Sequence, residues 1–241
     1  MIISHKHKFI FIKTKKTAGT SLEIALSKFL NSEDIITPIS GEDEPIRQRK
    51  YGIGCQNYRK NLIEYTPKDF AVLLIKRFRA RKYWNHISAE TVSEHLGKEL
   101  FNSYYKFTIV RNPWDKAVSR FFWQKGKEGS FGHEKQKFRK YILSGEAFLG
   151  GTGYEMYSIN GIPVMDSYVL YDELEAGLEK VSNDVGLSEN LYEVMRNINS
   201  KGNSRPKREH YKFYYDDDTR DIVATVCARE ISLFGFNFDN K

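Results

Sequence analysis

The feature that most constrains the fold is the order of three segments at the start of the chain. Residues 8–12 (KFIFI) form an apolar run rich in aromatic and β-branched side chains, which is typical of a buried strand. The polar residues 13–20 include Gly19, and apolar residues recur at helical spacing from Ser21, so we expect Thr20 or Ser21 to be the N-cap. Strand, glycine-bearing loop and helix are the first half of a βαβ unit.

Two later segments extend this pattern. Residues 105–110 (YKFTIV) predict a second strand, after which Asn112 suits a helix N-cap. Residues 167–171 predict a third strand, followed by a helix over 173–185. We therefore expect residues 1–241 to form a single domain of the α/β class. Its expected architecture is a P-loop-like, three-layer fold with a mainly parallel central sheet flanked by helices.

Other segments give weaker indications. Residues 70–75 fit either a strand or a buried helical turn, and both alternatives stay open. Ser88 is a suitable N-cap for a helix reaching residue 101, and 218–234 predict one long helix. The two cysteines are too few for a disulfide framework or a four-ligand metal site, so we expect both to be reduced thiols.

The charge of the chain indicates an anionic ligand. The formal net charge is +7, and lysines and arginines cluster in the first twenty residues, in 76–82 and in 201–212. Such an excess concentrates anions near a protein without identifying them. No apolar run approaches the roughly 20 residues of a membrane span, and no signal peptide is recognisable. We expect a cytoplasmic protein.

The first loop, KTKKTAGTS over residues 13–21, has the features of an anion site. Its backbone amides and the following helix N-terminus supply directed donors and partial positive charge. Thr17, Thr20 and Ser21 add hydroxyl groups, Lys16 adds a mobile charge, and Gly19 permits close approach of an oxyanion. The lysine precedes the only glycine, so this is not a Walker A sequence, and magnesium-dependent nucleotide hydrolysis is less favoured.

The second loop places an arginine where the second strand ends. Arg111 carries a planar guanidinium that can bind a phosphate through two hydrogen bonds. Ser119 lies two turns along the following helix and can direct its hydroxyl toward the same ligand. On these residues alone, a salt bridge or a helix cap explains Arg111 equally well.

Together, the two loops resemble a known family. Residues 9–22 resemble the 5′-phosphosulfate loop of sulfotransferases that use 3′-phosphoadenosine 5′-phosphosulfate (PAPS), and residues 107–122 resemble their 3′-phosphate-binding segment. The most similar branch contains carbohydrate sulfotransferases, including the heparan 2-O-sulfating enzymes and bacterial relatives. Residues 211–220 and 234–238 are similar to the C-terminal helix and tail of that branch. The family has proline where this chain has Lys15.

The resemblance implies a metal-independent, in-line transfer of a sulfuryl group from PAPS to an acceptor hydroxyl. The likeness to the carbohydrate branch implies that this hydroxyl belongs to a carbohydrate. PAPS then leaves as adenosine 3′,5′-bisphosphate. Lys16 is the expected catalytic cation at the oxygen that bridges phosphorus and sulfur. The expected cofactor-binding residues are Lys13, Lys16, Thr17, Ala18, Gly19, Thr20, Ser21, Arg111, Ser119 and, from the late basic loop, Arg205.

The resemblance also suggests a general base. Residues 85–89 (NHISA) are similar to the stretch in which the carbohydrate branch has its catalytic histidine, which implies this role for His86. Spacing alone favours an ordinary loop histidine. Glu90 and Glu94 are alternative bases, although the surface of a helix is their simpler interpretation.

Three other functions stay open at this level. A P-loop-like small-molecule kinase, a basic nucleic-acid-binding protein and a sulfotransferase without activity are each compatible with part of the pattern. We expect no nucleic-acid partner and no membrane-spanning segment. The basic segment 201–212 fits a cover over the 3′-phosphate, an attractor of an acidic acceptor, or a solvated loop. The segment 76–82, beside Tyr83 and Trp84, fits a sugar-binding surface or the polar edge of a buried element.

Overall fold

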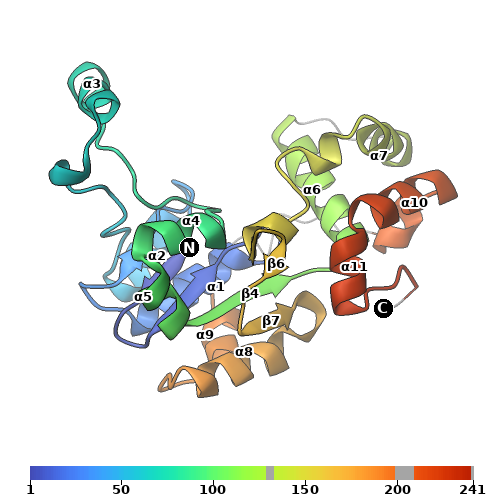
Figure 1. Cartoon of the computed structure of the whole chain (residues 1–241). Helices are drawn as coiled ribbons and strands as arrows, with labels where there is room; N and C mark the ends of the chain where they lie inside the picture. Colours follow the sequence, from blue (N-terminus) through green and yellow to red (C-terminus); the bar gives the residue numbers. More distant parts are fainter. Residues whose placement is uncertain (129–132, 199–208, 240–241) are drawn as a thin grey trace.

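The computed structural model describes residues 1–128, 133–198 and 209–239 and, for 125–128, the backbone only (Figure 1). The strands are β1 (Ile2–Ser4), β2 (Phe9–Ile12), β3 (Ile35–Ile36), β4 (Tyr105–Val110), β5 (Ser158–Ile159), β6 (Ile162–Pro163) and β7 (Ser167–Leu170). The helices are α1 (Gly19–Leu26), α2 (Glu44–Tyr51), α3 (Pro67–Lys76), α4 (Ala89–Leu96), α5 (Lys98–Ser103), α6 (Pro113–Glu128), α7 (Glu134–Leu143), α8 (Leu174–Asp184), α9 (Leu191–Arg196), α10 (Asp217–Val226) and α11 (Ala228–Phe234). No helix in these described ranges is both long enough and apolar enough to cross a bilayer.

The central sheet has the strand order β3-β1-β2-β4-β7. β2 and β4 are parallel, as are β4 and β7, whereas β1 is antiparallel to both of its neighbours. Four of the five strands therefore point in the same direction, which confirms the expected mainly parallel sheet. The register pairs Phe11 with Phe107 and Ile109 with Val169, so the apolar strand centres are aligned.

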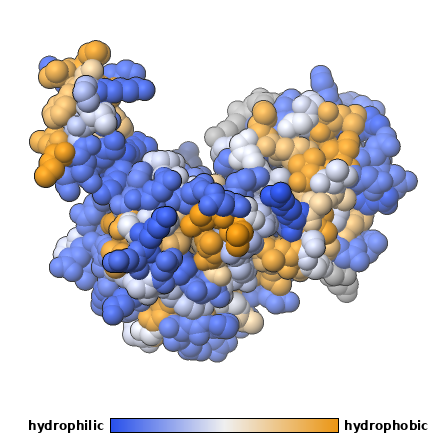
Figure 2. Space-filling view, viewed as in Figure 1, coloured by the Kyte–Doolittle hydropathy of each residue, from blue (hydrophilic) through white to orange (hydrophobic). Residues whose placement is uncertain are grey.

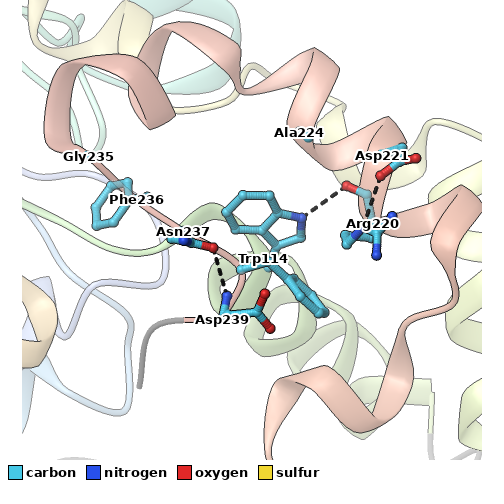
Figure 3. A pocket seen from close by; sticks show the side chains of 9 residues that line it. Trp114, Arg220, Asp221, Ala224, Gly235, Phe236, Asn237 and Asp239 are labelled. Atoms are coloured by element: carbon cyan, nitrogen blue, oxygen red, sulfur yellow. Dashed lines mark hydrogen bonds and ion pairs between the residues drawn. The ribbon is translucent and has the colours of Figure 1, made fainter.

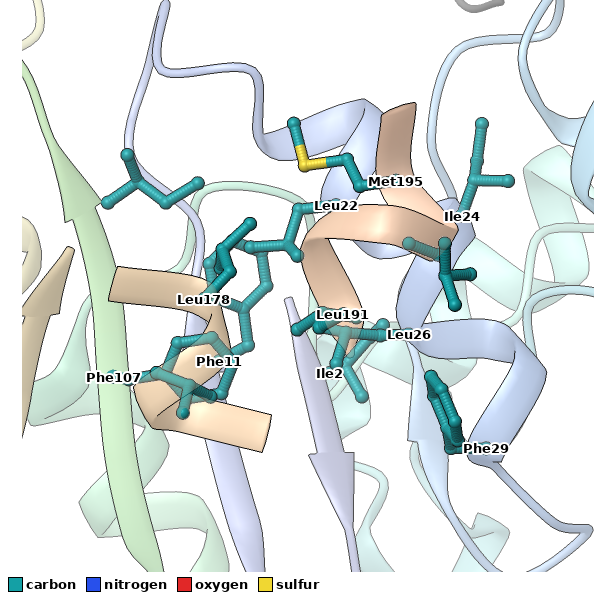
Figure 4. Close-up of a cluster of buried hydrophobic side chains, with 14 of the residues drawn as sticks. Ile2, Phe11, Leu22, Ile24, Leu26, Phe29, Phe107, Leu178, Leu191 and Met195 are labelled. Carbon is teal, nitrogen blue, oxygen red and sulfur yellow. The ribbon is translucent and has the colours of Figure 1, made fainter. Parts of the chain in front are cut away.

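Helices cover both faces of this sheet. Side chains alternate between the two faces along each strand, and the apolar strands therefore have a buried cluster on either side. Phe11 on β2 lies on the face covered by α1, α8 and α9, in a cluster with Leu22 and Leu178 (Figure 4). Ile10 and Ile12 point to the opposite face, where Val92 of α4 belongs to the same buried cluster. Two apolar faces enclosed by helices give the expected three layers.

A further buried cluster lies beyond the end of β4. It joins α6, α7 and α10, which are grouped on one side of the sheet in Figure 1, through aromatic residues such as Phe121, Phe138 and Tyr215. The ring centroids of Phe138 and Tyr215 are 4.9 Å apart in an edge-to-face arrangement. This cluster fixes α6 and therefore positions the second loop, which leads into it.

The predicted strands and caps agree with the structure at several positions. β2, β4 and β7 coincide with the three predicted strands to within one residue. Ser88 accepts a hydrogen bond from the amide of Thr91 at 3.3 Å, and Asn112 accepts one from the amide of Trp114 at 3.0 Å, so both are N-caps as predicted. Both cysteines are free thiols.

Other predictions are wrong. The first helix begins at Gly19 after Ala18, a left-handed N-cap residue (φ 58°) without a side-chain cap bond, so neither Thr20 nor Ser21 caps it. Gly97, which has a positive φ of 94°, divides the predicted helix that ends at residue 101. Cys227 separates α10 from α11 within the predicted 218–234 helix. Residues 70–75 are helical, but they are not buried.

Candidate active site at the carboxyl ends of the parallel strands

The first and second loops leave the sheet at the same edge. β2 and β4 are parallel neighbours, so residues 13–18 and 111–112 follow strand ends that lie side by side. The hydroxyl of Thr108 donates to the carbonyl of Ile12 at 2.8 Å, and that of Thr14 donates to the carbonyl of Ile109 at 2.6 Å. These buried bonds hold the start of the first loop against β4.

The backbone of the first loop is shaped for an anion. Lys16 (φ 64°) and Ala18 (φ 58°) are both left-handed, and α1 begins immediately afterwards at Gly19. Left-handed residues in such turns gather consecutive amides into a concave donor surface. A Cβ on Gly19 would lie 2.7 Å from Cγ of Lys13, so a larger residue does not fit there without displacement. Thr17, also in the loop, is buried.

Lys13 lies beneath this loop and has a carboxylate partner. Its Nζ is 2.6 Å from Oε2 of Glu23, and both side chains are buried. The amino group of Met1 contacts the other oxygen of Glu23. Burial by itself would raise the pKa of Glu23, but the Met1 amino group and Lys13 together lower it to about 2. In this arrangement Lys13 supports the loop from below, and its contact with a cofactor stays a prediction.

The next two lysines lie toward α6. The Nζ of Lys16 is 5.3 Å from the ring centroid of Trp123, and the Nζ of Lys15 donates to the carbonyl of Gly150 at 3.2 Å. Burial lowers the pKa of Lys15, and the positive charge of Arg120 adds to this effect. The loop therefore carries concentrated positive charge on the side that faces α6.

Arg111 joins the two loops. Its guanidinium is buried (3% exposed), and Nη1 donates to the carbonyl oxygen of Lys16 at 2.9 Å. Nε forms an ion pair with Asp115 at 2.6 Å, and the guanidinium lies 4.1 Å from the centroid of the Tyr171 ring, just after β7. Ser119, two turns along α6, is also buried. The arginine that the sequence suggested for a phosphate thus has Asp115 as a partner in this structure.

His86 lies beside the first loop. Its Nδ1 is 3.0 Å from the carbonyl oxygen of Lys13, although 73 residues separate the two. A carbonyl only accepts, so Nδ1 carries the proton and Nε2 carries the lone pair. Burial, followed by the charge of Lys13, lowers the pKa of His86 to about 4. The imidazole is therefore neutral at pH 7, with its unprotonated nitrogen on the side away from the loop.

A cavity of about 620 Å³ lies near the segment that Lys15 contacts. It is lined by Glu90 on α4, by residues 152–161 around β5, and by residues 225–230 at the junction of α10 and α11. Lys15 reaches this region through its bond to Gly150. Residues 152–161 are not recognisable as part of a site from the sequence, because a glycine-rich stretch has no periodic pattern. Their proximity to the first loop was visible only in the structure.

A second cavity, of about 470 Å³, borders the start of α6 (Figure 3). The indole Nε1 of Trp114 donates to the carbonyl of Arg220 at 3.0 Å, and the side-chain amide of Asn112 donates to the carbonyl of Asn237 at 3.2 Å. These bonds connect the second loop to α10 and to the C-terminal tail.

The predicted site residues are thus brought together in part. The first loop and the start of α1 form one continuous segment, to which Arg111 and His86 are hydrogen-bonded; it holds Lys13, Lys16, Thr17, Ala18, Gly19, Thr20 and Ser21. Ser119 lies on the next helix, and Glu90 lines the larger cavity. Arg205 falls outside the residues that the structure describes.

Comparison with known proteins identifies the class. Residues 1–147 match the model of the Sulfotransferase family, and the chain belongs to this family. An uncharacterized protein of Archaeoglobus fulgidus is 31% identical over 102 residues, which cover 42% of this chain and 82% of that protein. The residues that match the family model include β2, β4 and the two loops that follow these strands at the edge of the sheet.

Two solved structures are more distantly similar. Mouse sulfotransferase SULT7A1 complexed with PAP has 14% identity and a TM-score of 0.49, over 97% of this chain and 87% of that one. A sulfotransferase from Alicyclobacillus acidocaldarius has 14% identity and a TM-score of 0.43, over 96% of each chain. Both similarities are too weak to assign residues by superposition.

Proposed function

We propose that this chain transfers a sulfuryl group from PAPS to an acceptor hydroxyl and releases adenosine 3′,5′-bisphosphate, with residues 1–241 acting as one sulfotransferase domain. The observation that carries this proposal is the hydrogen bond from Arg111 to the carbonyl of Lys16. It unites two loops, each of which suits a phosphate, at the edge of the sheet where α/β proteins bind nucleotides.

The residues present fit the two ends of such a nucleotide. The amides of the left-handed turn, with the hydroxyls of Thr17, Thr20 and Ser21, suit the 5′-phosphate. Arg111 and Ser119 suit the 3′-phosphate, and Arg205 is a further candidate for it. When bound, PAPS supplies the sulfuryl group and a phosphate leaving group. The left-handed residues Lys16 and Ala18, directly before the N-terminus of α1, are the structural feature that supports this fit.

Lys16 is the proposed source of electrostatic catalysis. Sulfuryl transfer resembles phosphoryl transfer, in which positioning and charge stabilisation supply most of the rate enhancement. The ammonium of Lys16 projects from the loop toward α6, where the Trp123 ring limits its range. There it stabilises negative charge on the leaving phosphate oxygen. Together with the loop amides, it takes the role that a divalent metal has in other transferases.

His86 is the proposed general base. The bond from Nδ1 to the Lys13 carbonyl fixes the ring and its tautomer, so Nε2 is the atom that accepts a proton from the acceptor hydroxyl. With a pKa of about 4, the imidazole is in its basic form across the physiological range.

The cavity of about 620 Å³ is the proposed acceptor site. The phenol ring of Tyr154 suits the apolar face of a sugar, and Ser158 and Asn160 suit its hydroxyl groups. The lining has three carboxylates, among them Glu90 and Glu155, and one cation, Arg229, and this negative excess would repel a polyanionic chain. We therefore favour a carbohydrate acceptor that is neutral or carries amino groups over a highly sulfated one.

The test is transfer of label from ³⁵S-PAPS in the presence of EDTA, with a panel of neutral, amino-bearing and polyanionic glycans. We expect labelled product and stoichiometric adenosine 3′,5′-bisphosphate with one of the first two groups. Formation of ADP from ATP in the presence of Mg²⁺, without label transfer to any acceptor, would instead assign the chain to the kinases. Transfer to polyanionic glycans alone would contradict the acceptor class.

A further inference from the structure

Residues 59–82 form an arm that leaves the body and returns to it at the same place. A bridge pairs Arg59 with Arg81, and the amide of Lys60 donates to the carbonyl of Ala80 at 3.0 Å. Tyr58 and Tyr83 are buried in the body at the base of the arm. Figure 1 shows α3, the helix of the arm, well separated from the sheet and from the other helices.

The arm exposes large apolar side chains. None of its residues is buried, and Ile63, Leu74 and Ile75 are 89%, 80% and 80% exposed. Leu62, Phe70 and Phe78 are also exposed, and the tip is largely apolar in the space-filling view (Figure 2). Exposed apolar surface of this kind marks an interaction site in soluble proteins.

Local interactions, and not packing, form the helix of the arm. The side chain of Thr66 accepts from the amide of Asp69 at 3.2 Å, the side chain of Asp69 accepts from the amide of Thr66 in a capping box, and Pro67 takes the first helical position. A helix of ten residues is only marginally stable in water. A second surface that covers its apolar side chains would therefore stabilise it.

The arm also holds nearly all of the net charge of the chain. It contains eight lysines and arginines and two acids, a net of +6, whereas the whole chain has +7. Both acids are paired with lysines of the arm, Asp69 with Lys60 at 3.0 Å and Glu64 with Lys82 at 2.6 Å. The remaining excess lies mainly in residues 76–81, directly after the apolar helix.

We infer that the arm binds an anionic lipid surface, with α3 in the headgroup region, its aliphatic side chains inserted, and the lysines and arginines on lipid phosphates. Basic residues beside an apolar helix are the combination that anionic bilayers attract. A nucleic acid would match the charge but leave Ile63, Leu74 and Ile75 in water. A second copy would bring an arm of the same +6 charge, which disfavours pairing of two arms. Binding of lipid by the arm is independent of the proposed sulfuryl transfer.

The test is co-sedimentation of the full chain with vesicles of phosphatidylcholine alone or with 30% phosphatidylserine. We expect at least tenfold stronger binding to the anionic vesicles, and weaker binding as salt increases. The triple variant Arg77→Gln, Arg79→Gln, Arg81→Gln should bind the anionic vesicles at least tenfold more weakly than the unaltered chain. The variant Leu74→Ser, Ile75→Ser, which keeps the charge of the arm, should also bind the anionic vesicles at least tenfold more weakly.

A matched control removes the same charge from the body, through Lys98→Gln, Lys180→Gln and Arg196→Gln, and should bind within twofold of the unaltered chain. All of the arm positions to be changed are exposed, so the variants should keep their circular dichroism spectra and melting temperatures. Equal binding to both kinds of vesicle would overturn the inference. So would a dimer in sedimentation velocity that the Leu74→Ser, Ile75→Ser variant dissociates, without vesicle binding by the unaltered chain.

Discussion

Arg111 donates a hydrogen bond from Nη1 to the main-chain carbonyl of Lys16 at 2.9 Å, across 95 residues of sequence. The same guanidinium is paired through Nε with Asp115 at 2.6 Å. Arg111 therefore supports the backbone of the first loop, while Asp115 offsets part of its positive charge. A phosphate that binds at Arg111 must compete with this carboxylate.

This competition predicts opposite effects at the two positions. Arg111→Gln should weaken binding of adenosine 3′,5′-bisphosphate by roughly 10- to 100-fold, since a hydrogen bond to a charged group contributes about 1.5–3 kcal/mol. Arg111→Gln should also abolish the preference of the chain for the bisphosphate over adenosine 5′-phosphate. Asp115→Asn should strengthen binding of the bisphosphate a few-fold. Calorimetric titration measures both, with the exposed Arg139→Gln as the control. Equal losses for both nucleotides in Arg111→Gln would place the 3′-phosphate elsewhere.

Lys16 and Lys15 should differ in their effects on turnover. Lys16→Ala should lower kcat by roughly 100- to 1,000-fold, as removal of one stabilising donor from an active site does, and change nucleotide affinity only a few-fold. Lys15→Ala, which removes the contact with Gly150, should lower kcat much less. Steady-state kinetics and nucleotide titration separate these effects. If Lys16→Ala reduced affinity and kcat by the same factor, Lys16 would be a binding residue without a specific part in the transition state.

The environment of His86 predicts an unusual pH profile. Burial and the charge of Lys13 lower its pKa to about 4, so kcat/KM should not fall near pH 6.5 but only as the pH approaches 4. His86→Asn should lower kcat roughly 100- to 10,000-fold. Asparagine is the suitable replacement, because it tolerates the left-handed backbone (φ 57°) and can still donate to the Lys13 carbonyl. An unchanged profile in His86→Asn would rule out the base.

The same shift affects stability. The unfolded state binds a proton at His86 below its ordinary pKa of about 6.5, whereas the folded state does so only near 4. The free energy of unfolding should therefore decrease as the pH falls from 6.5 toward 4, by about 1–2 kcal/mol at pH 5. Urea denaturation at pH 7 and pH 5 should show this decrease in the unaltered chain and a smaller one in His86→Asn.

Much of this site could be predicted from the sequence where the signals are local. The strands before both loops are short apolar runs, and Asn112 and Ser88 are caps whose partners lie two or three residues away. The first loop is recognisable because its polar residues separate an apolar strand from a helix with regularly spaced apolar residues. Such features depend on neighbouring residues, and a single sequence reports them directly.

Features that depend on distant contacts were missed. β1 and β3 are only three and two residues long, and they exist because they pair in the sheet, β1 between β2 and β3. The position of His86 depends on a bond to Lys13, and only the family resemblance suggested the role that we propose for it. The exposure of residues 70–75 could not be predicted, because an apolar run normally indicates burial.

Gly19 offers a test of the loop geometry that does not depend on activity. Gly19→Ala places a Cβ 2.7 Å from Cγ of Lys13, whose buried side chain is fixed by its ion pair with Glu23. We expect a loss of about 1–3 kcal/mol in the free energy of unfolding, as in other overpacked sites. Gly41→Ala meets no atom within 4 Å and should change stability by less than about 0.5 kcal/mol. Equal stabilities in urea denaturation would show that Lys13 can move aside.

The most direct test of the central claim is calorimetric titration of the chain with adenosine 3′,5′-bisphosphate and, separately, with ATP and Mg²⁺. The paired loops predict micromolar or tighter binding of the bisphosphate without metal, and binding of ATP at least tenfold weaker. Equal or tighter binding of ATP that requires Mg²⁺, with no heat from the bisphosphate, would contradict the account.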